Sequence, residues 1–128
     1  MIYIIDTYAW VEYFINSKQG LKLKRLFEDK HNKFITMECC LSELKCYCLK
    51  NEYNFNEALN IIKTNSTILP IMLDIWLSAA DIRYVLRKNI LHFGLIDAIL
   101  VAKQKELNCK VISGDPHFKT LKNVVFMG

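Results

Sequence analysis

Short apolar runs alternate with longer stretches of helical periodicity along the whole chain, and this alternation constrains the fold more than any other feature. The runs have the length and β-branched content of buried strands. They cover residues 2–5, 33–36, 67–71, 109–113 and 123–127. Helices are predicted over 8–16, 20–30, 38–50, 55–65, 74–90 and 95–107. Strands separated by helices pair in parallel and are covered on both faces, so we expect one α/β domain over residues 1–128.

Composition excludes several other classes of protein. The chain has 128 residues, of which 52% are hydrophobic, which suffices for the core of one domain. No run of about 18 apolar residues could span a bilayer, so no membrane contact is expected. The opening MIYIIDTYAW lacks a basic region and a cleavage site, and it reads as a first strand rather than a signal peptide. We therefore expect a cytoplasmic protein.

The cysteines and the net charge carry less information. Five cysteines without a CxxC pair argue against both a disulfide framework and a zinc ribbon, so free thiols are expected. The formal charge of +4 permits contact with nucleic acid without requiring it. Basic residues that could contact an RNA backbone, or that could simply be solvated, are Lys18, Lys22, Arg25, Arg83, Arg87, Lys88, Lys119 and Lys122.

Four acidic residues occupy positions that can meet in space. Asp6 follows the first predicted strand and Asp115 follows the fourth, whereas Asp97 opens the last helix and Glu43 lies in the third. The carboxyl ends of parallel strands and the adjoining helix N-termini line one crevice. Carboxylates gathered there repel one another unless some are protonated or a hard divalent cation neutralises them. The pattern therefore predicts a metal site.

Each acid also has a simpler explanation. Asp6 could cap a helix, Asp115 could form a turn before Pro116, Asp97 could favour a helix dipole, and Glu43 could be solvated. The flanking residues weigh against these readings. Apolar residues surround Asp97 on nearly every side of its helix, and cysteines and leucines surround Glu43. Buried carboxylates are costly unless they are paired or bind metal, so the four are better explained together.

The same residues resemble the motif blocks of the PIN-domain ribonucleases. The blocks are DTYAWVEYF at 6–14, LSEL at 41–44, LIDAILVAKQKEL at 95–107 and VISGDPHF at 111–118. Each block is weakly specific alone, but the four occur in the family order and span essentially the whole chain. The short length and the DTYAW opening most resemble the toxin of VapBC-type toxin–antitoxin pairs.

The resemblance implies a Rossmann-like, three-layer α/β/α fold with a central, mainly parallel sheet. It implies a metal-dependent endoribonuclease whose catalytic residues are Asp6, Glu43, Asp97 and Asp115, with Asp6 and Asp97 as ligands of Mg²⁺ or Mn²⁺. Thr7 and Ser113 match positions whose hydroxyls support the ligands. Tyr8 departs from the serine that many members have there. The expected partners, all implied by the resemblance, are an RNA substrate, an antitoxin that blocks the acidic groove, and a second copy in a homodimer.

Two further observations bear on assembly and mechanism. The aromatic residues Tyr8, Trp10, Tyr13, Phe14 and Phe27 predict a dimer surface on the N-terminal helices, unless they fill the core. The three histidines match no catalytic pattern, and each is interpreted as a surface or structural residue. These are His31, His92 and His117.

Three other classes of protein have patterns that partly overlap with this one. A two-component receiver needs adjacent acids after its first strand, and a haloacid-dehalogenase-like phosphatase needs D-x-D, where this chain has Asp6 and Tyr8. The serious alternative is a non-catalytic PIN-like module that binds RNA or protein. The sequence leaves open the RNA target, the antitoxin, and whether one or two ions bind.

Overall fold

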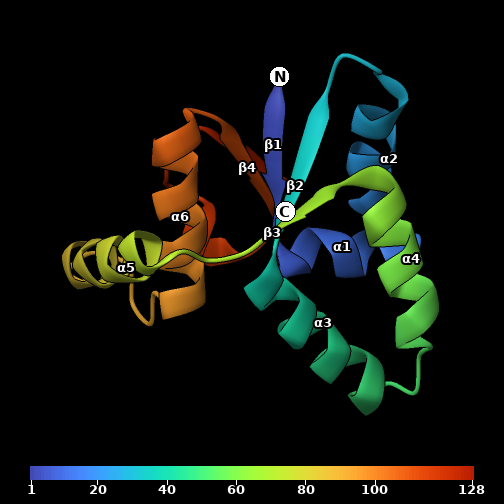
Figure 1. Ribbon diagram of the computed structural model, residues 1–128, viewed down its shortest axis with the longest axis horizontal. Helices are drawn as coiled ribbons and strands as arrows, with labels where there is room; N and C mark the ends of the chain where they lie inside the picture. The colour runs from blue at the N-terminus through green and yellow to red at the C-terminus, as the bar shows by residue number, and fades with distance from the viewer.

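A five-stranded parallel sheet forms the centre of the molecule, which we describe from a computed structural model of residues 1–128 (Figure 1). The strand order is β3-β2-β1-β4-β5, and every neighbouring pair is parallel. The strands are β1 (Ile2–Ile5), β2 (Lys33–Met37), β3 (Thr67–Leu69), β4 (Lys110–Ser113) and β5 (Val124–Phe126). The predicted three-layer α/β/α architecture is confirmed.

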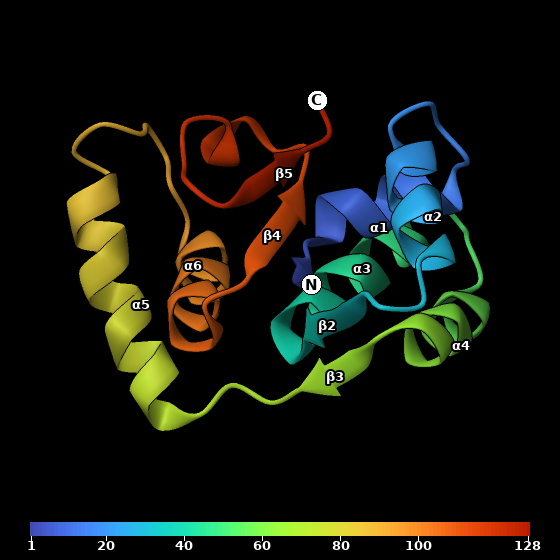
Figure 2. The same cartoon turned by 90° about the horizontal axis from the view of Figure 1, so that it is seen from above.

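Helices cover both faces of this sheet. In Figure 1, α5 and α6 lie on one side of the strands and the first four helices lie on the other. Figure 2 shows α5 as the outermost element, packed on α6. No helix has both the length and the apolar character needed to cross a membrane. The helices are α1 (Thr7–Phe14), α2 (Gly20–Glu28), α3 (Glu38–Lys50), α4 (Phe55–Asn65), α5 (Leu73–Leu86) and α6 (Leu95–Leu107), and a short 3₁₀ turn, η1 (Pro116–Phe118), follows β4.

The strand side chains divide the core into two clusters. On β1, Ile4 points to the α5–α6 face, whereas Tyr3 and Ile5 point to the face covered by α1–α4. This is the period-two alternation of a strand. Helix α6 is buried continuously from Ala98 to Gln104, as the apolar run Ala98–Ala102 predicts for most of that stretch. The position of α6 against the sheet therefore fixes where its N-terminus, with Asp97, is placed.

Several boundaries differ from the sequence predictions by one to four residues; the helices predicted over 8–16 and 20–30, for example, end at Phe14 and Glu28. The predicted strand 67–71 ends at Leu69, because Pro70 has no N–H to donate to a neighbouring strand. The predicted helix 74–90 begins at Leu73 and ends at Leu86, so Asp74 lies in the first turn and does not cap the helix. The 3₁₀ turn η1 was not predicted.

The N-terminal aromatics belong mostly to the monomer core. Trp10 is 1% exposed, and its ring packs against the partly buried Tyr13, Phe14 and Phe27. Tyr8 is 37% exposed, so the alternative that these residues fill the core holds for the other four. On α5, by contrast, Leu77 is 62% exposed. The unpartnered apolar surface lies on α5.

The order in which strands are added to the sheet changes side at β1. Connections run from β1 outward to β2 and β3, and the segment with α5 and α6 then returns to place β4 on the other side of β1. In open α/β sheets, ligands bind outside the carboxyl ends of the strands at such a switch point. Asp6 and Ser113 lie at this point, at the carboxyl ends of β1 and β4.

Candidate metal centre

Asp6 lies at the carboxyl end of β1 and is the N-cap of α1. One carboxylate oxygen accepts from the backbone N–H of Thr7 at 2.7 Å, and the other accepts from the Ser113 hydroxyl at 2.6 Å. The side chain is 5% exposed and forms no ion pair with Lys or Arg. Burial raises the pKa of Asp6 to about 7, and the charges of Asp97 and Glu43 add to this rise. Asp6 thus caps helix α1 and also lies in the acidic cluster predicted to bind a metal ion.

Glu43 is joined to Asp6 through Thr7. The Thr7 hydroxyl donates to Glu43 at 2.7 Å, while the Thr7 backbone N–H donates to Asp6. Partial burial of the carboxylate raises the pKa of Glu43, and the charges of Asp97 and Asp115 raise it further. The residue as a whole keeps an exposed surface, so this carboxylate faces both solvent and the other acids. Helix α3, which follows β2, brings Glu43 to the same edge of the sheet.

Ser113 connects the first strand to the fourth acid. Its hydroxyl is fully buried, donates to Asp6 and accepts from the backbone N–H of Asp115 at 3.0 Å. Asp115 caps η1, and its carboxylate accepts from the backbone N–H of His117 at 2.9 Å. The geometry agrees with the supporting position predicted for Ser113, because its oxygen orients two acids at once.

Asp97 is held at the N-terminus of α6 by two contacts. The Gly94 N–H donates to one of its oxygens at 3.2 Å, and the same oxygen lies 2.9 Å from Nδ1 of His117. The His117 ring is also 3.6 Å from an oxygen of Asp115 and packs against Phe93. The interpretation of His117 as a surface or structural residue therefore missed its contacts. The contact between residues 97 and 117 arises only when α6 packs beside the end of β4.

The four acids consequently belong to one chain of hydrogen bonds. It runs from Glu43 through Thr7 to Asp6, then through Ser113 to Asp115, and through His117 to Asp97. The charges of Asp97 and Asp115 influence residues at the other end of this chain. The structure thus places all four predicted acids at one edge of the sheet. The contact of His117 with Asp97 depends on tertiary packing, and only the nearness of His117 to Asp115 could be read from the sequence.

The donor atoms fall into two groups that could hold a cation. One consists of Asp6, Cys40 and Glu43, and the other of Asp97, Asp115 and His117, with the donor atoms of each group within 4.8 Å of one another. Carboxylate oxygens suit Mg²⁺ and Mn²⁺. A buried Asp6 with a raised pKa and no cationic partner fits such an ion, since a divalent charge would favour its ionised form. The residues present therefore fit the predicted cation.

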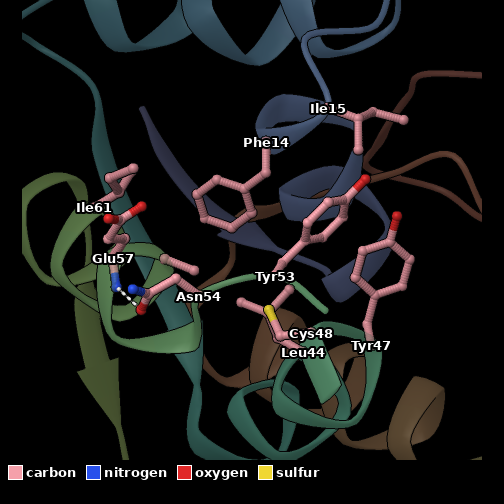
Figure 3. Close-up of a pocket in the computed structure, with 10 residues that line it drawn as sticks. Phe14, Ile15, Leu44, Tyr47, Cys48, Tyr53, Asn54, Glu57 and Ile61 are labelled. Carbon is pink, nitrogen blue, oxygen red and sulfur yellow. Dashed lines mark hydrogen bonds between the residues drawn. The ribbon is translucent and has the colours of Figure 1, made fainter. Parts of the chain in front are cut away.

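An apolar pocket adjoins this edge on the helical side. It lies between the end of α1, α3 and α4, has a volume of about 300 Å³, and includes Leu44, the residue next to Glu43 (Figure 3). Phe14, Tyr47 and Tyr53 present their rings to it.

Part of the predicted basic rim also approaches the acids. Arg87, just after α5, donates from Nε to the carbonyl of Phe93 at 2.8 Å, and Phe93 packs against His117. Arg87 lies beside Arg83 and Lys88 along one shallow pocket. Lys119 follows η1 and is exposed. The basic end of α5 is therefore connected to the acidic edge through one aromatic residue.

Comparison with known proteins identifies the family of the chain and several solved structures with a similar fold. The family model for the PIN domain matches residues 3–124. No curated protein sequence matches the chain. Solved structures match along nearly their whole length, and their low sequence identity makes this a likeness of fold.

Three of these structures come from toxin–antitoxin systems. VapBC2 from Rickettsia felis, bound to a DNA fragment from its promoter, is 18% identical, with 98% of this chain and 97% of that chain covered and a TM-score of 0.72. VapC20 from Mycobacterium tuberculosis, a sarcin–ricin loop cleaving toxin, is 17% identical, with 91% and 92% covered and a TM-score of 0.73. DNA-bound VapBC from Salmonella typhimurium is 12% identical, with 100% and 99% covered and a TM-score of 0.71.

Proposed function

This chain belongs to the PIN domain family, and on that basis we propose that it is a divalent-metal-dependent endoribonuclease, the toxin of a type II toxin–antitoxin pair. The observation that carries the proposal is the hydrogen-bonded chain of Glu43, Asp6, Asp115 and Asp97 at one edge of the sheet. No Lys or Arg forms an ion pair with any of the four. Such an arrangement is expensive for stability unless a cation completes it.

Asp6 and Asp97 are the proposed direct ligands, with Glu43 and Asp115 completing the acidic pocket. A bound Mg²⁺ or Mn²⁺ would lower the pKa of a water and offset the charge that develops on the phosphodiester. The protein supplies the positions of the oxygens. Each Asp6 oxygen receives one hydrogen bond, from Thr7 N–H or Ser113, so the carboxylate cannot rotate freely.

His117 is proposed as a positioning residue for Asp97. The imidazole and the Gly94 N–H contact the same oxygen of Asp97, Oδ2. Its other oxygen, Oδ1, takes part in no hydrogen bond or ion pair within the protein and remains available to a ligand. Packing of the His117 ring against Phe93 fixes the ring plane, and Phe93 is itself fully buried.

RNA is the proposed substrate. The acidic edge repels a phosphate backbone, so neighbouring cations must hold the strand until the metal acts. Arg83, Arg87 and Lys88 lie at the end of α5 that Phe93 connects to His117, and Lys119 follows η1 on the other side. These residues are the proposed contacts to the backbone.

An antitoxin is the proposed protein partner, and the structural neighbours that are VapBC complexes support it. The apolar pocket of Figure 3 is the proposed anchor point for it, because Leu44, the residue after Glu43, lines that pocket. A basic side chain on that segment would pair with the acids and prevent metal-dependent cleavage. The chemistry of an inhibiting segment is thus apolar at one end and cationic at the other.

A homodimer is proposed through α5. Its outer face carries Leu73, Leu77 and Tyr84, which are 73%, 62% and 71% exposed. Asp74 lies in its first turn and Asp81 in its second half, whereas the basic residues Arg83, Arg87 and Lys88 cluster at its end. Two copies of α5 packed antiparallel about a two-fold axis would cover the apolar stripe and set acidic against basic ends. This surface replaces the N-terminal aromatics predicted from the sequence.

Cleavage of RNA with and without divalent cations tests the enzymatic proposal. We expect cleavage with Mg²⁺ or Mn²⁺, none with a chelator, and a loss of about 100-fold or more in Asp97→Asn, because a direct ligand should matter at least as much as its supporting contacts. Asp29→Asn is the matched control, since Asp29 is exposed and precedes β2 at the opposite edge. RNA binding without cleavage in the wild type would favour the non-catalytic module instead.

A further inference from the structure

A thiol lies inside the acidic half-site formed by Asp6 and Glu43. Cys40 is 1% exposed and stands in the first turn of α3, one helical turn before Glu43. Its Sγ, a carboxylate oxygen of Asp6 and one of Glu43 all lie within 4.8 Å of one another. The helix holds two of these donors on one face, and the end of β1 supplies the third. The three donors are therefore held by regular secondary structure and not by a loop.

The sulfur atom distinguishes this half-site from an all-carboxylate one. Mg²⁺ takes oxygen ligands and gains nothing from a thiol, whereas Zn²⁺ binds cysteine sulfur at about 2.3 Å and carboxylate oxygen at about 2.0–2.2 Å. Those bond lengths place tetrahedral donors roughly 3.3–3.8 Å apart. Because the donor atoms lie within 4.8 Å of one another, the group needs to close by at most about 1.5 Å to reach that spacing. The exposed carboxylate of Glu43 offers the side chain most able to make that adjustment.

We propose that Asp6, Cys40 and Glu43 form a site for Zn²⁺ or another thiophilic divalent cation. On binding, the Cys40 sulfur forms a bond to the ion and its proton is released to solvent. The site shares Asp6 and Glu43 with the catalytic ion, so zinc and magnesium exclude each other there. This consequence, inhibition by zinc, rests on the proposed nuclease function, but formation of the site does not.

Spectroscopy of the metal-loaded wild-type protein provides the primary test. X-ray absorption at the zinc edge should show one sulfur neighbour at about 2.3 Å together with oxygen neighbours. Co²⁺ in place of Zn²⁺ should give a sulfur-to-metal charge-transfer band. A zinc environment of oxygen and nitrogen alone, or a cobalt spectrum without that band, would overturn the proposal.

Variants assign the sulfur to a residue. Cys40→Ser should lose the band, whereas the double variant Cys39→Ser/Cys46→Ser should keep it, because it removes the other accessible thiols. Glu43→Gln changes an exposed residue, so the variant should fold. The affinity of this variant for Co²⁺ should fall about tenfold or more, whereas the charge-transfer band should persist when the site is saturated with Co²⁺. A band that survives in Cys40→Ser, or that disappears in the double variant, would contradict the assignment.

The two proposals fail separately. No RNA is present in the spectroscopic experiment, so a sulfur-ligated ion in a protein without nuclease activity would leave the zinc site standing and remove the nuclease. Metal-dependent cleavage without sulfur ligation would do the reverse.

Discussion

Asp6 caps helix α1, and no cationic side chain of the fold neutralises its charge. Its two oxygens accept from Thr7 and Ser113, yet burial still raises its pKa to about 7. Hydrogen bonds to neutral donors therefore compensate only part of the cost of desolvation. A residue that merely caps a helix has no need to be buried among three other acids. The uncompensated cost of burying the Asp6 carboxylate therefore favours a metal ligand over a simple helix cap at this position.

The raised pKa of Asp6 predicts how stability depends on pH when no metal is present. The folded state holds this proton up to about pH 7, whereas the unfolded chain releases it near pH 3.8, so the free energy of unfolding falls as pH rises between these values. Three pH units at about 1.4 kcal/mol each set an upper bound of about 4 kcal/mol. Urea unfolding with a chelator should show this slope in the wild type and a flatter one in Asp6→Asn. Asp29→Asn should keep the wild-type slope, and equal slopes in all three proteins would contradict the prediction.

Metal binding should reverse this penalty. Mg²⁺ or Mn²⁺ binds the native acids and not the unfolded chain, so the melting temperature should rise with the logarithm of the metal concentration. At a metal concentration of 100 times Kd, the free energy of unfolding should increase by about 2.7 kcal/mol. The double variant Asp6→Asn/Asp97→Asn should show no such rise. Thermal scans that shift equally in both proteins would indicate a general effect of salt.

Helix packing near the site depends on one close approach at the element scale. Gly20 starts α2, and a Cβ there would meet the carbonyl of Glu12 and the Cα of Tyr13, which are backbone atoms of α1. Gly20→Ala should therefore destabilise the protein by about 1–3 kcal/mol. At Gly114 a Cβ would meet only the ring of Tyr8, which is 37% exposed and can move.

Urea unfolding of both alanine variants checks this difference. Gly114→Ala should cost less than Gly20→Ala, by at least about 1 kcal/mol. Equal losses would mean that the backbone contacts at Gly20 are no more costly to relieve than the contact of Gly114 with the Tyr8 ring, which would contradict the prediction.

The elements themselves could be predicted because their signals are local. Five apolar runs and six periodic stretches correspond to the five strands and six helices, and the acids could be placed because strand ends share an edge. The contact of His117 with Asp97 could not be predicted, since it depends on how α6 packs against β4. The exposure of Leu77 escaped prediction for a related reason: apolar residues surround α5 on two faces, and only tertiary packing decides which face is covered.

At the scale of the whole molecule, the exposed stripe on α5 predicts self-association. Light scattering at micromolar concentration should give twice the 15.0 kDa mass of one chain. Leu77→Lys should reduce the mass to that of one chain, because it places a charge in the middle of the proposed interface. Leu49→Lys is the matched control, since Leu49 is 70% exposed on α3 and lies away from α5. A monomeric wild type, or a dimeric Leu77→Lys, would rule out this interface.

The hydrogen bond between Ser113 and Asp6 spans 107 residues of sequence, and this separation has a consequence during synthesis. A ribosome releases Asp6 long before the segment that orients it, because Asp97, Ser113, Asp115 and His117 are made about a hundred residues later. Until then the nascent chain carries Asp6 and Glu43 without the contacts of Ser113 and His117. For a protein proposed to cut RNA, this order of synthesis delays completion of the acidic centre until those residues have been made.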